Sequence, residues 1–525
     1  MTKVKILDII YIKLIDKLTT KKGERYYMNT FMNGLKDATN YGYTENGAVK
    51  HLTTKSALLD MFAMCAAYRS RSDADCILLF KNAYEENPEY ALKCLFWCRD
   101  IRGGAGERRF FRVCMNWLAK NDAAAAERNM EYIAEFGRWD DLYTFFDTPL
   151  SVEALELIKK QFILDLSCET PSLLAKWMKS ENASSKETKR LAEITRKYIG
   201  LSHREYRTAL SVLRKRINVL ERLMSANEWD KIEFDKIPSK AGLIYKNAFA
   251  RRDIIKAKYE KFAKDETTKV NAAALYPYEV VEKALQCRYT RMDNTDRLMV
   301  NKYWENLPNW VKDANFNGIC VCDTSGSMMG TPINVAISLS LYCAERAGGP
   351  FANHYISFAS RPQLIETKGA DFVDKVFRIY KTNLIDNTNI EAVFELLLNT
   401  AIQNNCSQEE IPQNVVIISD MQVDAARGIG RNYNYNIGRW ENNPNTPMET
   451  LMESIRKKWM ANGYQLPCLV YWNVDARDNT ILDGGENVSY VSGFSPSIFK
   501  MILTGKTGYQ LMLETLNSER YSVIR

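Results

Sequence analysis

The sequence of 525 residues has only three histidines, which are far apart, and its twelve cysteines include no Cys-x-x-C pair. Zinc sites take Cys and His ligands at short, regular spacing, so the sequence does not favour one. Six of the cysteines lie instead in apolar stretches: Cys65, Cys94, Cys98, Cys114, Cys320 and Cys322. Such cysteines are typical of buried free thiols in the reducing cytoplasm, which is where we expect the protein.

Long apolar runs are also missing. No stretch approaches the roughly 18 apolar residues that span a membrane, so we expect no membrane partner. Residues 1–17 alternate apolar and charged side chains, and they lack the apolar core and the cleavage site of a signal peptide. They predict an amphipathic helix.

The motifs of common enzymes are absent as well. The chain has no His-Glu-x-x-His, no nucleophile elbow, and no Cys/His or Ser/His/Asp arrangement with a supporting context. The Gly-rich turn at 103–106 lacks the Gly-Lys-Ser/Thr ending of a phosphate-binding loop. That ending does occur at 505–507, but Lys500 stands where the first glycine of the motif should be. We therefore expect no catalytic activity.

The Gly-rich turn has two interpretations. It is either a tight connection between helices, with local ion pairs Arg99–Asp100 and Glu107–Arg108, or a place where Arg102 and Arg108 contact nucleic-acid phosphates. The sequence does not decide between them.

Charge is unevenly divided along the chain. Residues 1–316 contain 54 basic and 43 acidic side chains, whereas residues 317–525 contain 17 and 21. Residues 186–261 alone hold 20 basic and 10 acidic side chains. A basic module followed by an acidic one predicts two binding functions with different partners.

The first part of the chain, up to about residue 285, has the three-and-four apolar spacing of amphipathic helices, for example at 56–70 and 107–121. Short turns separate these segments, and neither strand alternation nor a strict repeat period is visible. We predict an all-α, HEAT-like helical repeat module over residues 1–300.

From residue 317 the pattern changes to short apolar strands that alternate with helices. Strands are predicted at 318–323, 352–360, 413–420, 466–474 and 487–494, and helices at 332–347, 370–380, 389–404, 449–462 and 496–503. This alternation predicts an α/β domain over residues 301–525 with a mostly parallel sheet covered on both faces. Ligands of such sheets bind at the carboxyl ends of the strands.

Short oxygen side chains gather at those strand ends. Asp323, Ser325 and Ser327 stand at alternate positions after the first predicted strand, Thr388 precedes a predicted helix, and Asp420 ends a further strand. Carboxylate and hydroxyl oxygens suit a small hard cation such as Mg²⁺. The alternative is that the serines only cap the next helix and that Asp420 only ends its strand.

These three elements, in this order, resemble the metal-ion-dependent adhesion site of the von Willebrand factor A domain. The resemblance covers about 200 residues. It implies a doubly wound, Rossmann-like fold and Mg²⁺ or Mn²⁺ bound by Asp323, Ser325, Ser327, Thr388 and Asp420. It also implies that a partner's acidic residue completes the coordination shell and that the ion serves binding and not catalysis.

The N-terminal module has a resemblance of its own. Residues 96–118, with an Arg-Asp pair and the Gly-rich turn, are similar to the TROVE module of the Ro ribonucleoprotein autoantigen. Residues 173–180, 205–232 and 237–253 are closer to the TROVE-like domain-of-unknown-function family 2828, in which we place the chain. Ro proteins bind structured small RNA and RNA ends on a basic ring of HEAT-like repeats, so the resemblance implies RNA as a partner.

A basic helix predicted within residues 202–223 is the best RNA candidate among the residues themselves. Clustered cations attract phosphates, and nearby aromatic rings can stack on bases; the alternative is a solvated helix face. With two arginines of the Gly-rich turn, the candidate RNA-binding residues are Arg204, Arg207, Arg214, Lys215, Arg216, Arg102 and Arg108.

Together these features predict a non-enzymatic, monomeric RNA-binding protein of Ro type. It would hold structured small RNA or RNA ends on the helical module, and Mg²⁺ with a protein ligand on the α/β domain. The alternative is a metal-dependent protein–protein scaffold or assembly factor without RNA binding. A third possibility is a metal-dependent nuclease that uses Asp323 and Asp420.

Overall fold

The computed structural model describes residues 39–525 except 218, 290–293, 312–315, 359–360, 383–387, 425–430, 435–438, 443–449, 483–486 and 503–505. By its contacts the chain divides into two compact units, Met1–Gly42 and Tyr43–Arg525. The predicted helix at 1–17 lies outside the described residues. The second unit contains the predicted α/β domain and the predicted helical module without its first 42 residues. The boundary near residue 300 stays a prediction.

Helices make up most of the described chain before residue 306. In order, they are α3 (Ala57–Met64), α4 (Asp73–Glu86), α5 (Pro88–Arg99), α6 (Arg109–Asn121), α7 (Ala123–Arg128), α8 (Ile133–Phe136), α9 (Ser151–Ser167), α10 (Leu174–Trp177), α11 (Lys186–Ile199), α12 (His203–Arg216), α13 (Leu220–Ser225), α14 (Ser239–Arg251), α15 (Asp253–Lys264), α16 (Pro277–Tyr289) and α17 (Asn294–Glu305). Two short strands, β1 (Tyr41–Tyr43) and β2 (Val49–His51), precede them. The predicted helical character of this part of the chain is confirmed, whereas its HEAT-like repeat arrangement stays a prediction.

Sequence signals explain where several of these helices begin. Ser72 and Ser202 cap α4 and α12, and each capping box is closed by the acidic residue three positions later, Asp75 and Glu205. Pro88 occupies the first turn of α5. These side chains satisfy backbone N–H groups that have no partner within the helix.

The second module is built on a six-stranded sheet with the order β10-β9-β6-β3-β4-β5. Its strands are β3 (Gly318–Cys322), β4 (His354–Ser357), β5 (Gln363–Glu366), β6 (Asn414–Ser419), β9 (Cys468–Asn473) and β10 (Val488–Ser492). All neighbours are parallel except β4 and β5. The five predicted strands are confirmed, whereas β5 was not predicted because its side chains are mostly exposed at the sheet edge.

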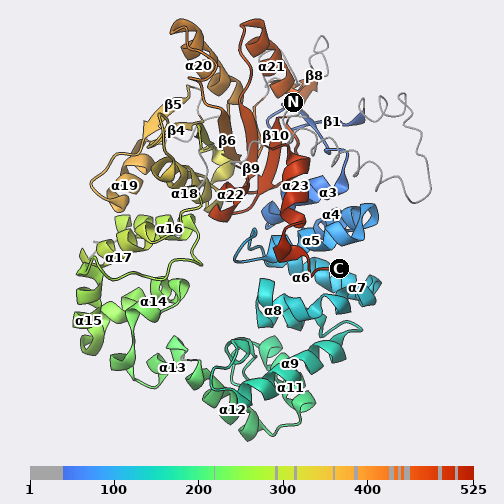
Figure 1. Ribbon diagram of the computed structural model, residues 1–525, viewed down its shortest axis with the longest axis vertical. Helices are drawn as coiled ribbons and strands as arrows, with labels where there is room; N and C mark the ends of the chain where they lie inside the picture. The colour runs from blue at the N-terminus through green and yellow to red at the C-terminus, as the bar shows by residue number, and fades with distance from the viewer. Residues whose placement is uncertain are drawn as a thin grey trace, which may run out of the picture. The chain divides into compact units, whose positions relative to one another are not determined.

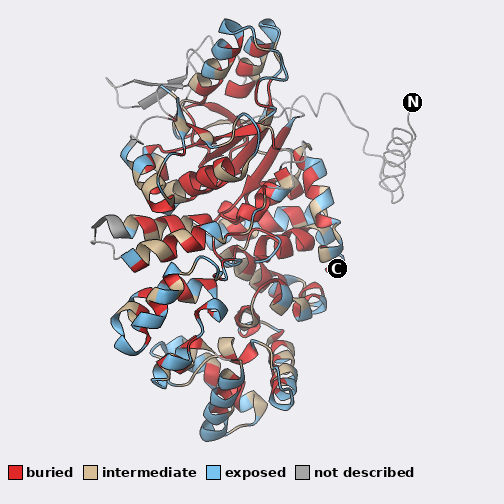
Figure 2. Ribbon diagram, turned by 60° about the vertical axis from the view of Figure 1, so that its left-hand side comes forward, coloured by how far each residue is buried: buried red, intermediate tan, exposed pale blue. Residues whose placement is uncertain are grey.

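Helices cover this sheet. They are α18 (Thr331–Arg346), α19 (Phe372–Thr382), α20 (Ile390–Gln403), α21 (Leu451–Ala461), α22 (Phe499–Ile502) and α23 (Gly508–Leu516), and a hairpin of β7 (Arg431–Asn434) and β8 (Arg439–Asn442) lies between α20 and α21 in sequence. Every residue of β3 is buried, and Figure 2 shows the central strands in the colour of buried residues. Because successive strand residues point to opposite faces, both faces of this sheet must be covered.

Both the first helices and the last helices of the helical module contact the sheet module (Figure 1). At the start, α3 packs against β10 and α5 against α23, and the Arg69 guanidinium lies 3.7 Å from the centre of the Phe494 ring. At the end, α16 and α17 pack against α19, and Trp304 stacks on Phe372 with ring centroids 4.1 Å apart. These contacts fix the two modules within one compact unit.

The Gly-rich turn is a close-packed connection between α5 and α6. A Cβ at Gly104 would lie 2.0 Å from the carbonyl oxygen of Trp97, and Gly106 has a φ of +69°. Only glycine fits the first position, and the left-handed backbone of the second favours it. The turn therefore needs its glycines for packing, whether or not its arginines contact phosphates.

The local ion pairs predicted around this turn are wrong. Three of the charged residues pair instead with distant partners, each at 2.7 Å: Arg99 with Asp141, Asp100 with Arg520, and Glu107 with Arg69. Neighbouring residues in a chain point in different directions, so their side chains seldom meet.

The predicted burial of six cysteines is confirmed. Cys65, Cys94, Cys98, Cys114, Cys320 and Cys322 are all buried with free thiols. Within the described part of the chain, no helix is both long and apolar enough to cross a membrane.

Candidate metal centre

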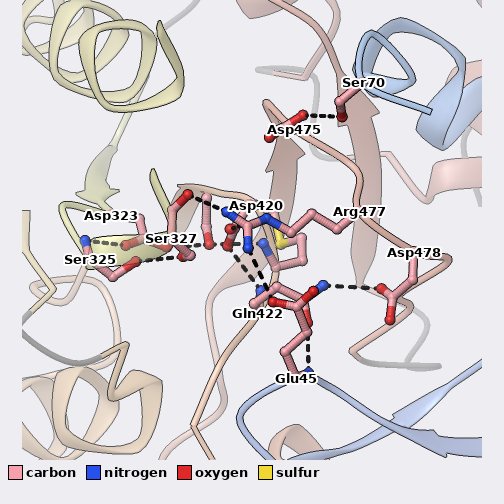
Figure 3. A network of polar contacts seen from close by, with 12 residues as sticks. Glu45, Ser70, Asp323, Ser325, Ser327, Asp420, Gln422, Asp475, Arg477 and Asp478 are labelled. Atoms are coloured by element: carbon pink, nitrogen blue, oxygen red, sulfur yellow. Dashed lines mark hydrogen bonds and ion pairs between the residues drawn. The ribbon is translucent and has the colours of Figure 1, made fainter. Parts of the chain in front are cut away.

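Two carboxylates meet at the carboxyl edge of the sheet (Figure 3). Asp323 follows β3 and Asp420 follows β6, and these two strands are parallel neighbours with Cys322 opposite Ile418. The backbone N–H of Asp323 donates to the Ile418 carbonyl at 3.0 Å, which extends the pairing to the strand end. The structure thus brings together two predicted site residues that are 97 positions apart in sequence.

Asp323 is completely buried and is held by hydrogen bonds on both oxygens. Its Oδ1 accepts from the Ser325 N–H at 2.9 Å, and its Oδ2 accepts from the Ser419 hydroxyl at 2.5 Å. The Ser325 and Ser327 hydroxyls lie 3.0 Å apart. Burial raises the pKa of the Asp323 carboxyl, although the bonds from Ser419 and Ser325 act in the opposite direction.

The buried carboxylate of Asp420 accepts fewer hydrogen bonds than that of Asp323. Its Oδ1 accepts from the Gln422 N–H at 3.1 Å, but its Oδ2 is buried with no hydrogen bond from any described residue. Burial, and then the negative charge of Asp323, raise the pKa of Asp420 to about 6. The Gln422 N–H, the Ser327 hydroxyl and the charge of Arg477 act on this pKa in the opposite direction. A buried pair of carboxylates without sufficient positive charge is the environment that a cation stabilises.

Thr388 supplies a further oxygen without a partner. The residue is 1% exposed, and its Oγ1 is buried without a hydrogen bond among the described residues. Its carbonyl accepts from the Asp424 N–H at 3.0 Å, so Thr388 lies beside the loop that follows β6. The nearby Asp386 lies outside the described residues.

The donor set fits a hard divalent cation. The candidate ligands are all oxygens, from two carboxylates and three hydroxyls, and both Asp420 Oδ2 and Thr388 Oγ1 lack a hydrogen bond within the described chain. In the part of the chain that the structure describes, no three His, Cys, Asp or Glu residues form a metal-binding group. A metal at this edge would therefore depend on the hydroxyls.

Comparison with known proteins gives the family. Residues 44–194 and 171–315 match the domain of unknown function DUF2828 and together span more than half of the chain. The chain belongs to the DUF2828 family. Residues 317–520 match a second domain of unknown function, DUF7788. The "Uncharacterized protein L728" of Acanthamoeba polyphaga mimivirus is 29% identical over 512 residues, which covers 89% of this chain and 85% of the viral protein.

Sequence reasoning missed an arginine at the edge of the candidate metal centre of this DUF2828 protein. Nη2 of Arg477 donates to the Ser327 carbonyl at 2.5 Å, and its Nε lies 3.6 Å from Oδ2 of Asp420. Its Nη1 lies 3.1 Å from the Glu45 carboxylate. Arg477 follows β9, so the rule that ligands bind at carboxyl ends of strands could have pointed to its loop.

The segment that contains Glu45 was missed for a different reason. The Glu45 N–H donates to the Gln422 side-chain carbonyl at 2.8 Å, and the Asn46 amide donates to the Gln422 backbone carbonyl at 2.7 Å. These partners are 376 or more positions apart. No pattern in the sequence indicates such a contact, because only the folded chain brings the two segments together.

The structure divides the predicted RNA-binding residues of this DUF2828 protein into two groups. Arg214 is engaged within the protein, since its guanidinium donates to the carbonyls of Ala175 and Met178 at 2.8 and 2.9 Å and to the Ser180 hydroxyl at 3.0 Å. Two others donate to backbone carbonyls: Arg216 to Leu166 at 2.9 Å, and Arg102 to Glu135.

The second group is exposed. Arg204, Arg207 and Lys215 lie on the surface of α12, and Arg108 lies just before α6. None of the four has an ion pair or side-chain hydrogen bond with another described residue. These cations are available to a ligand without the loss of an existing contact.

Proposed function

We propose that residues 301–525 form a von Willebrand factor A-type domain whose metal centre binds an acidic group of a protein partner. The supporting observation is the buried Asp323–Asp420 pair together with two buried oxygens, on Asp420 and Thr388, that have no hydrogen bond among the described residues. Such oxygens are costly unless a cation or water satisfies them. In this proposal the domain acts in binding, and the ion serves to hold the partner's acidic group.

Each residue has a distinct part in this proposal. Asp420 and Thr388 present the oxygens that would bind the ion, and Asp323 contributes charge while Ser419 and the Ser325 N–H hold it in place. Bound Mg²⁺ or Mn²⁺ would supply a Lewis-acidic centre that accepts a carboxylate oxygen. Arg477 adds a fixed positive charge at the rim, which favours an anionic ligand.

A Thr388→Val substitution tests this function. It replaces the unpartnered hydroxyl by a methyl group of similar size, so we expect folding stability to be kept or raised while Mn²⁺ affinity falls about 10-fold or more. Titration calorimetry with MnCl₂ and with MgCl₂ measures the affinity.

Thr367→Val is the matched control. Thr367 also has a buried hydroxyl without a hydrogen bond among the described residues. It follows β5, which runs antiparallel to β4, so it lies beside the start of β4 and not at the carboxyl ends of the parallel strands. Its affinity for Mn²⁺ should equal that of the wild type. Equal affinity in the Thr388 variant, or no metal binding by the wild-type protein, would contradict the proposed function.

We further propose that the helical module is a HEAT-like array of TROVE type that binds RNA. The specific support is the exposed group of cations on α12, together with the net charge of +10 over residues 186–261. Such a surface attracts phosphates without reading base identity. RNA binding would be separate from the metal centre, which lies on the acidic module.

Neutralising α12 tests RNA binding. We expect the triple variant Arg204→Gln, Arg207→Gln and Lys215→Gln to bind structured RNA about 10-fold or more weakly at low salt. The magnitude of the slope of log K against log salt should fall by about 2 to 3, since each of the three phosphate contacts contributes roughly 0.7 to 0.9. Filter binding at several salt concentrations measures both quantities.

The control makes the same charge change on α15. Lys256, Lys261 and Lys264 are exposed there, and their replacement by Gln should leave RNA affinity nearly unchanged. If both triple variants lose affinity equally, binding depends only on net charge and α12 is not an RNA site. Wild-type protein that binds no RNA would favour the metal-dependent scaffold, and RNA cleavage in Mn²⁺ would favour the nuclease.

A further inference from the structure

On the helical module, the carboxylates of Asp140 and Asp141 are surrounded by a larger number of basic side chains. Asp141 is completely buried and pairs with Arg99 at 2.7 Å and with Arg112 at 2.6 Å. Asp140 pairs with Arg138 at 2.7 Å and with Arg112 at 3.0 Å. The arginines come from α5, α6 and the segment before the short helix Trp139–Phe145, so the fold and not the sequence gathers them.

Two further cations, one weakly paired and one without an ion pair among the described residues, belong to this cluster. Lys179 Nζ lies 3.9 Å from Asp140, at the outer limit of an ion pair. Arg108 has no ion pair with a described residue, and partial burial of its otherwise exposed side chain, followed by the positive charges of Arg138 and Arg112, lowers its pKa. Five cations thus surround two carboxylates, which leaves this cluster with a net charge of +3.

This positive cluster is accessible from solvent. The side chains of Arg112, Arg138 and Lys179 are 32%, 23% and 24% exposed, and Arg108 is exposed. Arg108 also stands at the N-terminal end of α6, where a helix disfavours positive charge and favours an anion. An arrangement that keeps like charges together at a surface is stabilised by an anionic ligand.

An aromatic ring connects the cluster to a cleft. The Arg138 guanidinium lies 3.8 Å from the centre of the Trp177 ring, and Trp177 in turn lines a cleft of about 660 Å³ beside α12 and α13. The cleft is also lined by Lys176, by Ser180 and by Arg207, one of the unpaired cations of α12. This volume suits a small polar ligand such as one nucleotide.

We propose that Arg108, Arg138, Lys179 and Trp177 form a binding site for single-stranded RNA, in which the cations hold successive phosphates and the cleft receives a base beside Trp177. This proposal rests on the RNA-binding function proposed above. It extends the RNA-binding surface from α12 to the cation cluster around Asp140 and Asp141. A simple phosphate site would need the cations only. The adjoining tryptophan and cleft favour a ligand that carries both phosphate and base.

The experiment compares two labelled ligands: a ten-nucleotide oligouridylate and an abasic sugar-phosphate oligomer of the same length. We expect the double variant Arg108→Gln and Lys179→Gln to bind both ligands about 10-fold or more weakly. Its salt slope should be lower by about 1.4, because two phosphate contacts are lost. Trp177→Ala should weaken only the oligouridylate, by about 5-fold or more, and Trp177→Phe should restore most of its affinity.

The control is the double variant Lys256→Gln and Lys261→Gln, which removes the same charge from α15. Fluorescence anisotropy gives the affinities, and thermal unfolding shows that each variant is folded. If wild-type protein binds the oligouridylate and the two double variants behave alike, this location is wrong while RNA binding stands. If Trp177→Ala weakens both ligands equally, the cleft does not receive a base. If wild-type protein binds neither ligand, both proposals fall.

Discussion

Replacing Asp420 by Asn is expected to stabilise the metal-free protein at neutral pH and to abolish its stabilisation by Mg²⁺. The buried carboxylate must ionise beside Asp323 at neutral pH, and the amide removes that requirement. Its pKa of about 6, against an ordinary value of 3.8, corresponds to a gain of up to about 3 kcal/mol in the metal-free state. In the wild type, Mg²⁺ at one hundred times its Kd should contribute about 2.7 kcal/mol, which the variant would not show.

The pH dependence follows from the direction of the shift. Because the folded pKa is raised, the native state binds more protons than the unfolded state between about pH 4 and pH 6. The contribution of Asp420 to the stability of the metal-free wild type should therefore be fully present below this range and be lost as the pH rises through it. Asp323, whose pKa is also raised by burial, acts in the same direction. The Asn variant should show a weaker decline.

Thermal unfolding between pH 4 and pH 8, with EDTA or with excess MgCl₂, measures both effects. Asp475→Asn is the matched control, since Asp475 follows the neighbouring strand β9 and accepts a hydrogen bond from Ser70 at 2.8 Å. It should leave the response to Mg²⁺ unchanged. A Mg²⁺ response that survives in the Asp420 variant would contradict the assignment of this carboxylate to the metal centre.

Replacing Arg99 by Met is expected to lower the free energy of unfolding by about 3 kcal/mol or more. Arg99 is 2% exposed, and its Nε and Nη2 bond Asp141 Oδ2 at 2.8 and 2.7 Å. Removal of the guanidinium leaves a completely buried carboxylate with Arg112 as its remaining ion-pair partner. Methionine fills a similar volume, so the loss reports the charge and not a cavity.

Urea unfolding of the wild type and of the variant measures this difference. Arg190→Met is the control, because Arg190 also pairs with two carboxylates, Asp147 and Glu187, but on an exposed surface. Exposed pairs contribute little, so this variant should unfold near the wild-type midpoint. Equal destabilisation by the two substitutions would show that burial does not determine how much the Arg99–Asp141 ion pair contributes to the free energy of unfolding.

The predicted strands show why so much of the sheet module could be anticipated. The runs at 318–323 and 413–420 are apolar at nearly every position, which is typical of strands covered on both faces. Parallel strands end at one edge, so the polar residues after each run must be near one another. That argument alone places Asp323 beside Asp420, as the structure does.

The helical module shows where such arguments stop. The charge of α12 is visible in the sequence, but the sequence does not show that Arg214 bonds three groups inside the protein while Arg207 remains exposed. It does not reveal the cation cluster either, because Arg112 lies in α6 whereas Lys179 lies in the connection between α10 and α11. Helix periodicity predicts which face is buried, but not which side chains meet across the fold.

The sequence by itself determined the division into a helical and an α/β module, five of the six strands of the main sheet, the family and the oxygen residues at the strand ends. These depend on local periodicity and on a fixed spacing along the chain. Tertiary structure decided which charges are paired, which oxygens lack a hydrogen bond within the described chain, and that Arg477 and Glu45 lie at the edge of the candidate metal centre. Those features depend on distances between residues far apart in the chain, and only packing of the whole unit fixes such distances.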